Sequence, residues 1–280
     1  MTHLPSAKHR LLFSTVTLGL IASILAAAGD GLELPLTKLF VTDAGVFISV
    51  AFLFFGGAAG MLVTLLFGRK SKAVFDPKRH LQKKDTWKLL STVGFTIFAN
   101  ILILLGLQQE STGTASILQN VMTVAIVVFA FLFLKEKISK QFGIGVALIV
   151  LGSIALSITN VQSFSISAGS LYLIAGYIAM GGFYTVMKLL SERNPAECNF
   201  IRCFLVGTIA LIIAFCLGEQ LPSLSDTLGL MTVGFIVNGL ANMLLMYGQR
   251  HLGAARVGAI DGLAPLLGVI FAIPILGEAP

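Results

Sequence analysis

Residues 112–136 read TGTASILQNVMTVAIVVFAFLFLKE, and a weaker copy of this stretch returns near the C-terminus. Its apolar part is long enough to cross a membrane, which takes about 20 residues of α-helix. A shift of 142 residues brings polar and glycine residues onto identical ones: Asn100, Gly106 and Glu136 meet Asn242, Gly248 and Glu278. Such matches carry more weight than apolar ones in a hydrophobic chain. The sequence therefore predicts two structural repeats.

The composition indicates an integral membrane protein. Of the 280 residues 56% are hydrophobic and only 11% are charged, and the mean hydropathy is +0.93. A soluble globular domain of this composition would have too little polar surface to cover itself. We therefore expect an all-α membrane protein made of several spans.

Nine apolar spans are expected, with edges uncertain by several residues. They fall at 11–34, 46–67, 89–107, 112–134, 142–160, 168–189, 200–218, 228–249 and 254–276. Five spans per repeat is an odd number, so the second repeat enters the membrane from the opposite side. We expect two inverted five-helix repeats, at 1–160 and 161–280. The counterpart of the fifth span would begin near residue 284, which predicts a fragment lacking its tenth helix; a nine-span protein is the alternative.

The basic residues predict the orientation. With a cytoplasmic N-terminus, eighteen of the nineteen Lys and Arg residues face the cytoplasm, and only Lys38 lies outside. The basic segment 68–88 then faces either phospholipid headgroups or a regulatory partner. The basic residues sit in short loops rather than in an aromatic-interleaved patch, which argues against a nucleic-acid partner. We expect a multi-pass protein of the cell membrane whose first helix is an anchor and no cleaved signal peptide.

Neither a metal site nor a disulfide framework is expected. Cys198, Cys203 and Cys216 form no CxxC pair and cluster around one span. All four histidines fall in predicted cytoplasmic segments, and no HExxH or GxSxG pattern occurs in a span. The sequence thus predicts no cofactor and no catalytic residues, with a membrane-embedded enzyme as a disfavoured alternative.

Asp261 is the most informative polar residue, because it lies inside the last expected span. A charge at mid-bilayer costs about 2.5–3.5 kcal/mol on insertion scales, so it should face other helices or water. Its partner in the other repeat is Gln119. A carboxylate there can bind a cationic group or exchange a proton; an ion pair or a hydrogen bond to a neighbouring helix is the structural alternative.

Matched polar pairs occur in both repeats. Thr96 and Asn100 lie one turn apart, and the same shift carries them to Asn238 and Asn242. These pairs either form interhelical hydrogen bonds or line a hydrated path. Asn120, beside Gln119, allows the same two interpretations.

Tyr177, Tyr184 and Lys188 share one face of the sixth span by their spacing. We expect the tyrosines to form cavity walls and Lys188 to reach the cytoplasmic interface. Arg202 is interpreted first as an interfacial anchor.

Asp30 and Glu33 lie near the outer end of the first span, in GDGLELPLTK. They belong either to an exposed loop or, if the first helix extends to Lys38, to the external mouth of a pathway, where they could attract cations or protons. If both are neutralised, the second interpretation predicts a change in transport.

Two stretches resemble the EamA repeat of the drug/metabolite transporter superfamily. They are ASILQNVMTVAIVVFAFLFLKEKISKQFGIGVALIVLGSIAL at 115–156 and GAARVGAIDGLAPLLGVIFAIPILGE at 253–278. The resemblance implies ten helices in two inverted repeats that move small metabolites, commonly as exporters of amino acids or related compounds. An inverted repeat places the substrate site at the interface of the two halves.

Other functions of the chain stay open at this point. A lipid-linked sugar flippase of the same superfamily and a nontransporting membrane sensor are the alternatives. The substrate, the transport direction, a proton as the coupling ion and a homodimer are also left undecided by the sequence.

Overall fold

The computed structural model describes residues 7–40, 45–67, 79–110, 115, 118–157 and 167–276, and all the elements that they form are helices. The first half contains α1 (Ala7–Lys38), α2 (Val46–Phe67), the 3₁₀ turn η3 (Lys83–Asp85), α3 (Thr86–Leu107), α5 (Asn120–Leu134) and α6 (Lys140–Ser157). The second contains α7 (Ala168–Leu190), α8 (Pro195–Leu217), α9 (Leu224–Gly234), η5 (Phe235–Ala241), α10 (Asn242–Leu252), α11 (Ala254–Asp261) and α12 (Ala264–Leu276).

Seven helical segments of the described chain are long and apolar enough to cross a membrane, and two shorter apolar ones are Asn120–Leu134 and Lys140–Gly152. Together these nine helical segments correspond to the nine expected spans, so the expected all-helical membrane fold is confirmed. Several helices begin or end at residues other than those expected from the sequence. α1 continues to Lys38, and α3 and α8 begin earlier than hydropathy predicts. The expected start of the fourth span, 112–114, and the last residues of the expected fifth span lie outside the described residues.

Local signals explain the early start of α8. Asn194 accepts hydrogen bonds from the backbone N–H groups of Ala196 and Glu197, and Pro195 occupies the first turn. An Asn cap followed by proline is a strong start signal, because proline lacks an N–H that the first turn would leave unpaired. Hydropathy alone misses such a start, since the first turn is polar.

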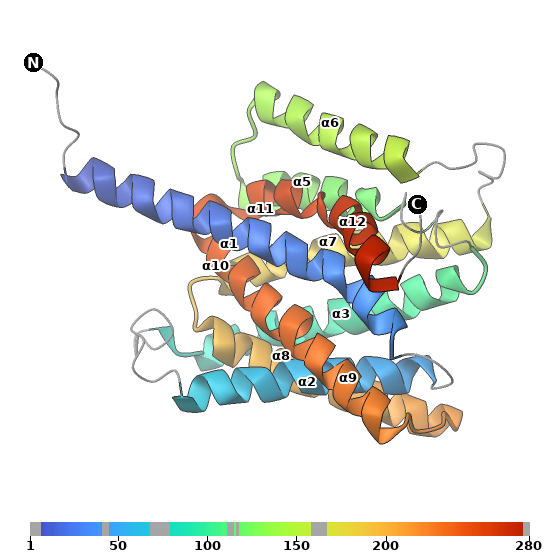
Figure 1. Ribbon diagram of the computed structural model, residues 1–280. Helices are drawn as coiled ribbons and strands as arrows, with labels where there is room; N and C mark the ends of the chain where they lie inside the picture. Colours follow the sequence, from blue (N-terminus) through green and yellow to red (C-terminus); the bar gives the residue numbers. More distant parts are fainter. Residues whose placement is uncertain are drawn as a thin grey trace, which may run out of the picture.

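The helix contacts have the symmetry expected of two repeats. α3 packs along α7, and its counterpart α10 packs along α1; α5 packs on α7, and its counterpart α12 packs on α1. α2 packs on its own counterpart α8. Figure 1 shows α1 and α7 running in opposite directions. A two-fold axis between inverted repeats exchanges each helix pair with the pair formed by its counterparts, which is the pattern of these contacts.

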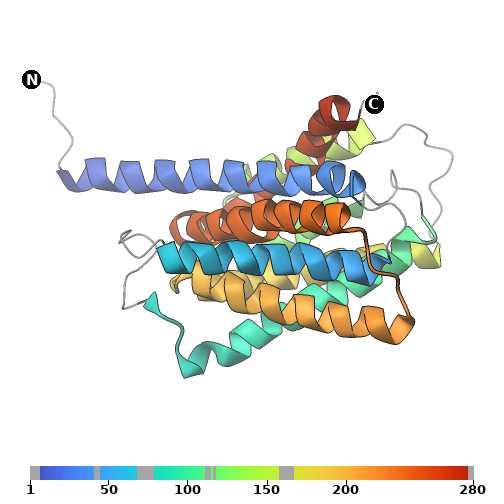
Figure 2. The same cartoon turned by 60° about the horizontal axis from the view of Figure 1, so that its bottom comes forward.

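The edges of the bundle expose apolar side chains. α6 lies apart from the main bundle in Figure 1 and turns Ile144, Leu148 and Leu151 outward. The first turns of α1 extend beyond the other helices in Figure 2. Apolar exposure of this kind suits a hydrocarbon environment, where helices satisfy all their own backbone groups.

Small residues allow α2 and α9 to approach at backbone distance. A Cβ added at Gly56 would strike the backbone carbonyl of Met231, and one added at Gly234 would strike that of Leu53. The two contacts are reciprocal. Gly56 and Gly234 therefore let the two helices approach at backbone distance, and this contact holds the two repeats against each other.

Three helices depart from regular geometry near the middle of the bundle. η5 is a π-helical segment between α9 and α10, and a two-residue turn at Gly262–Leu263 separates α11 from α12. At the corresponding place in the first repeat, the Met122 N–H bonds the Gln119 carbonyl three residues back. Pro265 follows the turn, as the second residue of α12. Broken helices at membrane depth are tolerated where they line a cavity.

The carboxylate of Glu136 joins the repeats at one end of the bundle. Its two oxygens accept hydrogen bonds from the backbone N–H groups of Ala254 (2.7 Å) and Ala255 (3.0 Å), at the start of α11. Gly253 precedes them with φ +92°, and a Cβ there would meet the same carboxylate at 2.9 Å. Glu136 therefore caps α11, and a negative charge is favourable at a helix N-terminus.

We predict that Glu136→Ala lowers stability by about 1–3 kcal/mol, because two partly buried N–H donors lose their acceptor. Thermal unfolding of the protein in detergent measures this loss. Glu192→Ala removes an exposed carboxylate from a turn and is the matched control. Equal unfolding temperatures for the two variants would show that the cap does not stabilise the junction.

Candidate functional site

A cavity of about 530 Å³ lies between the two repeats. Its lining combines acidic, basic, amide, hydroxyl and aromatic side chains from both halves. Ten of the eleven site candidates from the sequence line it: Asp30, Glu33, Thr96, Asn100, Gln119, Tyr177, Tyr184, Asn238, Asn242 and Asp261. The volume suits a small organic molecule. The sequence reasoning missed Arg202, Phe54, Phe183, Met122 and Met180, which also line it.

Asn120 is the exception. It is buried at the start of α5 but does not appear in the cavity lining, whereas its neighbour Gln119 does. Gln119 therefore lines the cavity, whereas Asn120 does not; a role of Gln119 in a transport path stays a prediction.

Two carboxyl groups meet at one tyrosine hydroxyl. The Tyr184 hydroxyl lies 2.7 Å from Asp261 Oδ2 and 3.2 Å from Asp30 Oδ2. Asp261 is only 2% exposed. Asp30 and Glu33 are not in a loop, because α1 continues past them to Lys38 and both face the cavity; their role at an external mouth stays a prediction. The contact joins α1, α7 and α11, so it links both repeats.

The matched amide and hydroxyl residues bond within their own helices. Thr96 Oγ1 donates to the Thr92 carbonyl at 2.8 Å, and Asn100 Nδ2 donates to the Thr96 carbonyl at 2.7 Å. Asn242 Nδ2 donates to the Val237 carbonyl at 3.2 Å, within the distorted segment. None of these three hydrogen bonds joins two different membrane spans, so they are not the interhelical bonds that the structural alternative expected. The amide oxygens and hydroxyls of these side chains keep spare hydrogen-bonding capacity.

Arg202 is not an interfacial anchor. It is 2% exposed, and its guanidinium lies 5.5 Å from the ring centre of Phe54 and 5.1 Å from that of Phe183. Its Nη2 donates to the Asn238 carbonyl at 3.3 Å. Proximity to the charged turn at 188–193 suggested the interface, but α8 begins at Pro195 and carries Arg202 two turns into the bundle.

Three buried polar atoms of the cavity residues have no hydrogen-bond partner in the described structure. They are Arg202 Nε, Asn238 Nδ2 and Asp261 Oδ1. An unpaired buried polar group costs about 1–3 kcal/mol, so a native structure keeps few of them. Two donors and one acceptor, all in residues of one cavity, indicate a site that a polar ligand completes.

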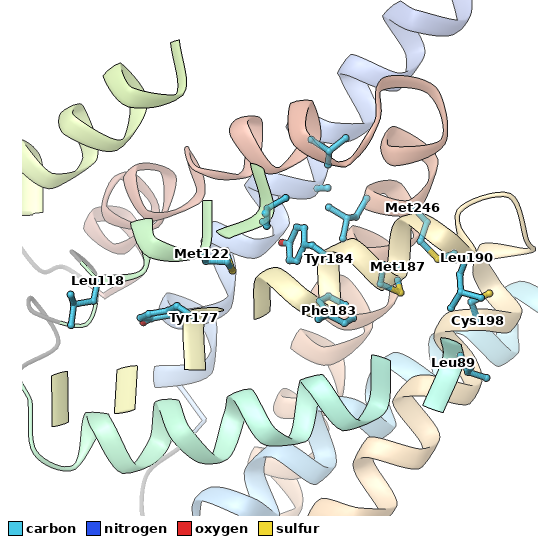
Figure 3. Close-up of a cluster of buried hydrophobic side chains, with 14 of the residues drawn as sticks. Leu89, Leu118, Met122, Tyr177, Phe183, Tyr184, Met187, Leu190, Cys198 and Met246 are labelled. Carbon is cyan, nitrogen blue, oxygen red and sulfur yellow. The ribbon is translucent and has the colours of Figure 1, made fainter. Parts of the chain in front are cut away.

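Apolar side chains close the cavity at the end where the basic loops meet. Figure 3 shows Leu89, Met187, Leu190, Cys198 and Met246 packed beyond Tyr184 along α7. Lys188 Nζ also donates to the Gln249 carbonyl at 2.6 Å, and Arg250 donates to the carbonyls of Ser191 and Arg193. Lys188 thus binds a neighbouring helix at this end rather than extending freely.

The lining continues in the other direction to Leu107, the last residue of α3, and to Ala115. At this opposite end, hydroxyl groups of Ser167 and Ser170 bond Glu110 and tie the end of α3 to the start of α7. The same hydrogen bonds, from Ser167 first, hold the pKa of Glu110 below its ordinary value. The cavity therefore extends away from the basic loops.

Comparison with known proteins decides the family. The EamA-like transporter family matches residues 17–158 and again residues 167–280. The chain belongs to the EamA-like transporter family. The double match corresponds to the two repeats seen in the helix contacts.

Two relatives of this EamA-like protein are named uncharacterized transporters. One, from Methanothermobacter thermautotrophicus, is 28% identical over 201 residues, which make up 68% of this chain and 57% of that protein. The other, YetK from Bacillus subtilis, is 29% identical over 273 residues, which make up 93% of this chain and 81% of YetK. The match thus spans little more than half of the Methanothermobacter protein.

A solved structure has the same fold. One crystal structure, described only as that of a protein, aligns with a TM-score of 0.75 at 16% sequence identity, covering 95% of this chain and 90% of the other. At that identity the likeness establishes the fold alone.

We predict that Tyr184→Phe destabilises the protein by about 1–3 kcal/mol at neutral pH, because Asp261 Oδ2 then loses the hydroxyl that donates a hydrogen bond to it. The loss should shrink as the pH falls, since a protonated carboxyl needs no donor. Thermal unfolding across pH 5–8 measures both effects. Tyr172→Phe, on the exposed face of α7, is the matched control. A pH-independent loss would contradict the role given to the hydroxyl.

Proposed function

We propose that this EamA-like protein is a secondary transporter that exports amino acids or related small metabolites across the cell membrane by alternating access. The observation that carries the proposal is the polar cavity of about 530 Å³ at the interface of the two repeats. Inverted-repeat transporters bind their substrates at that interface, near discontinuous helices. Asp261 and Ala264, on either side of the turn between α11 and α12, belong to this lining, as do Val237 and Asn238 of the π-helical segment η5.

The packing at the two ends supports alternating access. Apolar side chains and backbone hydrogen bonds seal the end with the basic loops, while the cavity extends toward the other end. With the proposed cytoplasmic N-terminus, this is a state closed to the cytoplasm. Rocking of one repeat against the other would open the Lys188–Gln249 and Arg250–Ser191 contacts and admit substrate from the cytoplasm.

The contact of Tyr184 with two carboxyl groups supports a proton as the coupling ion. A hydroxyl has one hydrogen to donate, so both contacts are hydrogen bonds only when one carboxyl is protonated and donates to the hydroxyl oxygen. The charged and titratable groups lining the site are Asp30, Glu33, Tyr177, Tyr184, Arg202 and Asp261. The site thus binds one exchangeable proton between Asp30 and Asp261.

Proton release converts this pair into two carboxylates that attract a cationic substrate group. Proton and substrate then compete for one site, which is the condition for exchange of one against the other. An inward proton gradient would drive the substrate outward. Raising the external pH removes the shared proton and should slow export.

The proposal predicts that cells expressing the intact protein release particular amino acids or related metabolites into the medium. Asp261→Asn should lower this release at least about tenfold, because it removes a carboxylate that hydrogen-bonds within the site. Metabolite profiling of the medium against an empty vector measures release without assuming a substrate. Asp226→Asn, in the first turn of α9 outside the cavity, keeps a side-chain oxygen that can accept from the capping residue Ser223 and is the matched control.

The same assay separates the alternatives. No change in release or uptake by a protein verified to reach the membrane would overturn the transporter proposal. Movement of a lipid-linked species instead of a water-soluble one would identify a flippase, and ligand binding without flux would identify a sensor.

Coupling is tested in liposomes containing the purified protein. We expect an imposed pH gradient to accelerate wild-type transport of a released metabolite. In Asp30→Asn and Asp261→Asn the gradient should have no effect, even where exchange without a gradient persists. Equal acceleration in both variants would show that another group takes the proton.

A further inference from the structure

Arg202 carries a buried charge that forms no ion pair within 4.0 Å among the described residues, although Glu33 of the same cavity acts on it electrostatically at longer range. The ion pairs within 4.0 Å among the described residues lie elsewhere, at Asp85 and Glu197. The guanidinium instead sits between the rings of Phe54 and Phe183 and makes one backbone contact, to Asn238, besides a weak one to Cys203. A guanidinium has five N–H donors. Burying a charge with so few partners is costly, unless a ligand supplies the missing ones.

A second unpaired donor lies beside it. Asn238 Nδ2 is buried without a partner, as is Arg202 Nε, and the two residues are joined by the bond from Arg202 Nη2 to the Asn238 carbonyl. Asn238 belongs to the π-helical segment η5, where the wider turn leaves this carbonyl free to accept from outside its own helix. Both residues line the cavity. Two unpaired donors next to a fixed positive charge require an anionic acceptor.

The remaining charges of the cavity decide which anion fits. Asp30, Glu33 and Asp261 line the same space. A doubly charged phosphate would be repelled by these carboxyl groups. A carboxylate carries one charge and two oxygens, which matches the two donors at Arg202 and Asn238. A cationic group on the same molecule would face the acidic side chains.

Aromatic rings separate the basic and acidic parts of the cavity. Phe183 packs against Arg202, and its ring centre lies 5.5 Å from that of Tyr184 in an edge-to-face arrangement. The Tyr184 hydroxyl contacts Asp261 and Asp30. The order from Arg202 to the pair Asp30 and Asp261 is therefore cation, ring, ring and carboxyl pair, so opposite charges on one ligand can reach these two places; Glu33 is the further acidic residue of the lining.

We infer that Arg202 and Asn238 form a subsite for the carboxylate of a zwitterionic substrate, whose ammonium group faces Asp261 and Asp30. The inference rests on the proposed function, because it assigns one part of the same cavity. It adds a requirement on the substrate that transport alone does not impose. Amino acids meet this requirement, whereas their amides and their decarboxylated amines do not.

The test compares matched compounds in liposomes containing the purified protein. Each of the twenty standard L-amino acids is offered with its amide and its decarboxylated amine, and counterflow uptake is measured. For the amino acids that are transported, we expect the wild type to prefer the acid over the amide by about 10- to 100-fold, the range for a hydrogen bond to a charged group. Arg202→Gln should reduce this preference to near unity.

Two further variants make the result specific. Arg202→Lys keeps the positive charge but cannot form the bidentate hydrogen bonds of a guanidinium, so it should retain part of the preference for the acid over the amide. Arg256→Gln removes an exposed arginine from α11, outside the cavity lining, and should keep the full preference. If Arg202→Gln does not fold, the wild-type comparison of acid with amide still decides the inference.

The outcomes distinguish this inference from the proposed function. Equal transport of acid and amide by the wild type, or an unchanged preference in Arg202→Gln, overturns the carboxylate subsite while transport stands. A wild type that moves none of the acids but releases other metabolites from cells also overturns it. A wild type that moves nothing in either assay removes the proposed function itself.

Discussion

The structure depends on one constraint, which is that a bilayer offers no water to polar groups. Every backbone N–H and carbonyl in the lipid must find a partner inside the protein, so the chain is helical wherever it meets hydrocarbon. Three departures from regular helix in the described chain are the π-helical segment η5, the turn at Gly262–Leu263 and the tightened turn at Gln119, and residues in or next to each of them line the central cavity. Residues of the same cavity hold three of the unpaired buried polar atoms. The protein thus places irregular backbone and unpaired polar atoms around the space where a polar substrate can pair with them.

The two repeats agree in geometry and differ in charge. Their helices exchange partners as a two-fold axis requires, and each breaks a helix near the same depth. Yet the residue of the first repeat that corresponds to Asp261 is the uncharged Gln119. The first repeat supplies a different acidic residue to the cavity, Asp30 of α1. Symmetric packing supports two alternative closures of one bundle. Asymmetric charge gives the cavity a basic wall and an acidic wall, which a symmetric set of residues could not provide.

The closed end and the site are mechanically connected through α7. Tyr177 and Tyr184 line the cavity, and Lys188, one turn beyond Tyr184, bonds the end of α10. Gln249 of α10 in turn donates to the Tyr184 carbonyl at 3.0 Å. The carboxyl pair and the sealed end are therefore connected by hydrogen bonds through one turn of α7 and through α10, without an intervening loop.

Much of this protein could be read from its sequence, because the governing forces act locally along the chain. The run of apolar residues sets each span, the positions of Asn100, Gly106 and Glu136 reveal the repeat, and a buried charge such as Asp261 has to face the bundle. The tertiary structure alone decided which polar residues meet. Arg202 falls at the start of the expected span 200–218, which begins five residues later than the helix itself, and Asp30 lies near the expected end of a helix that in fact continues to Lys38. Asn120 is indistinguishable from Gln119 until the start of α5 fixes their directions. Such outcomes depend on helix ends and rotations, which packing between distant segments determines and a single sequence does not specify.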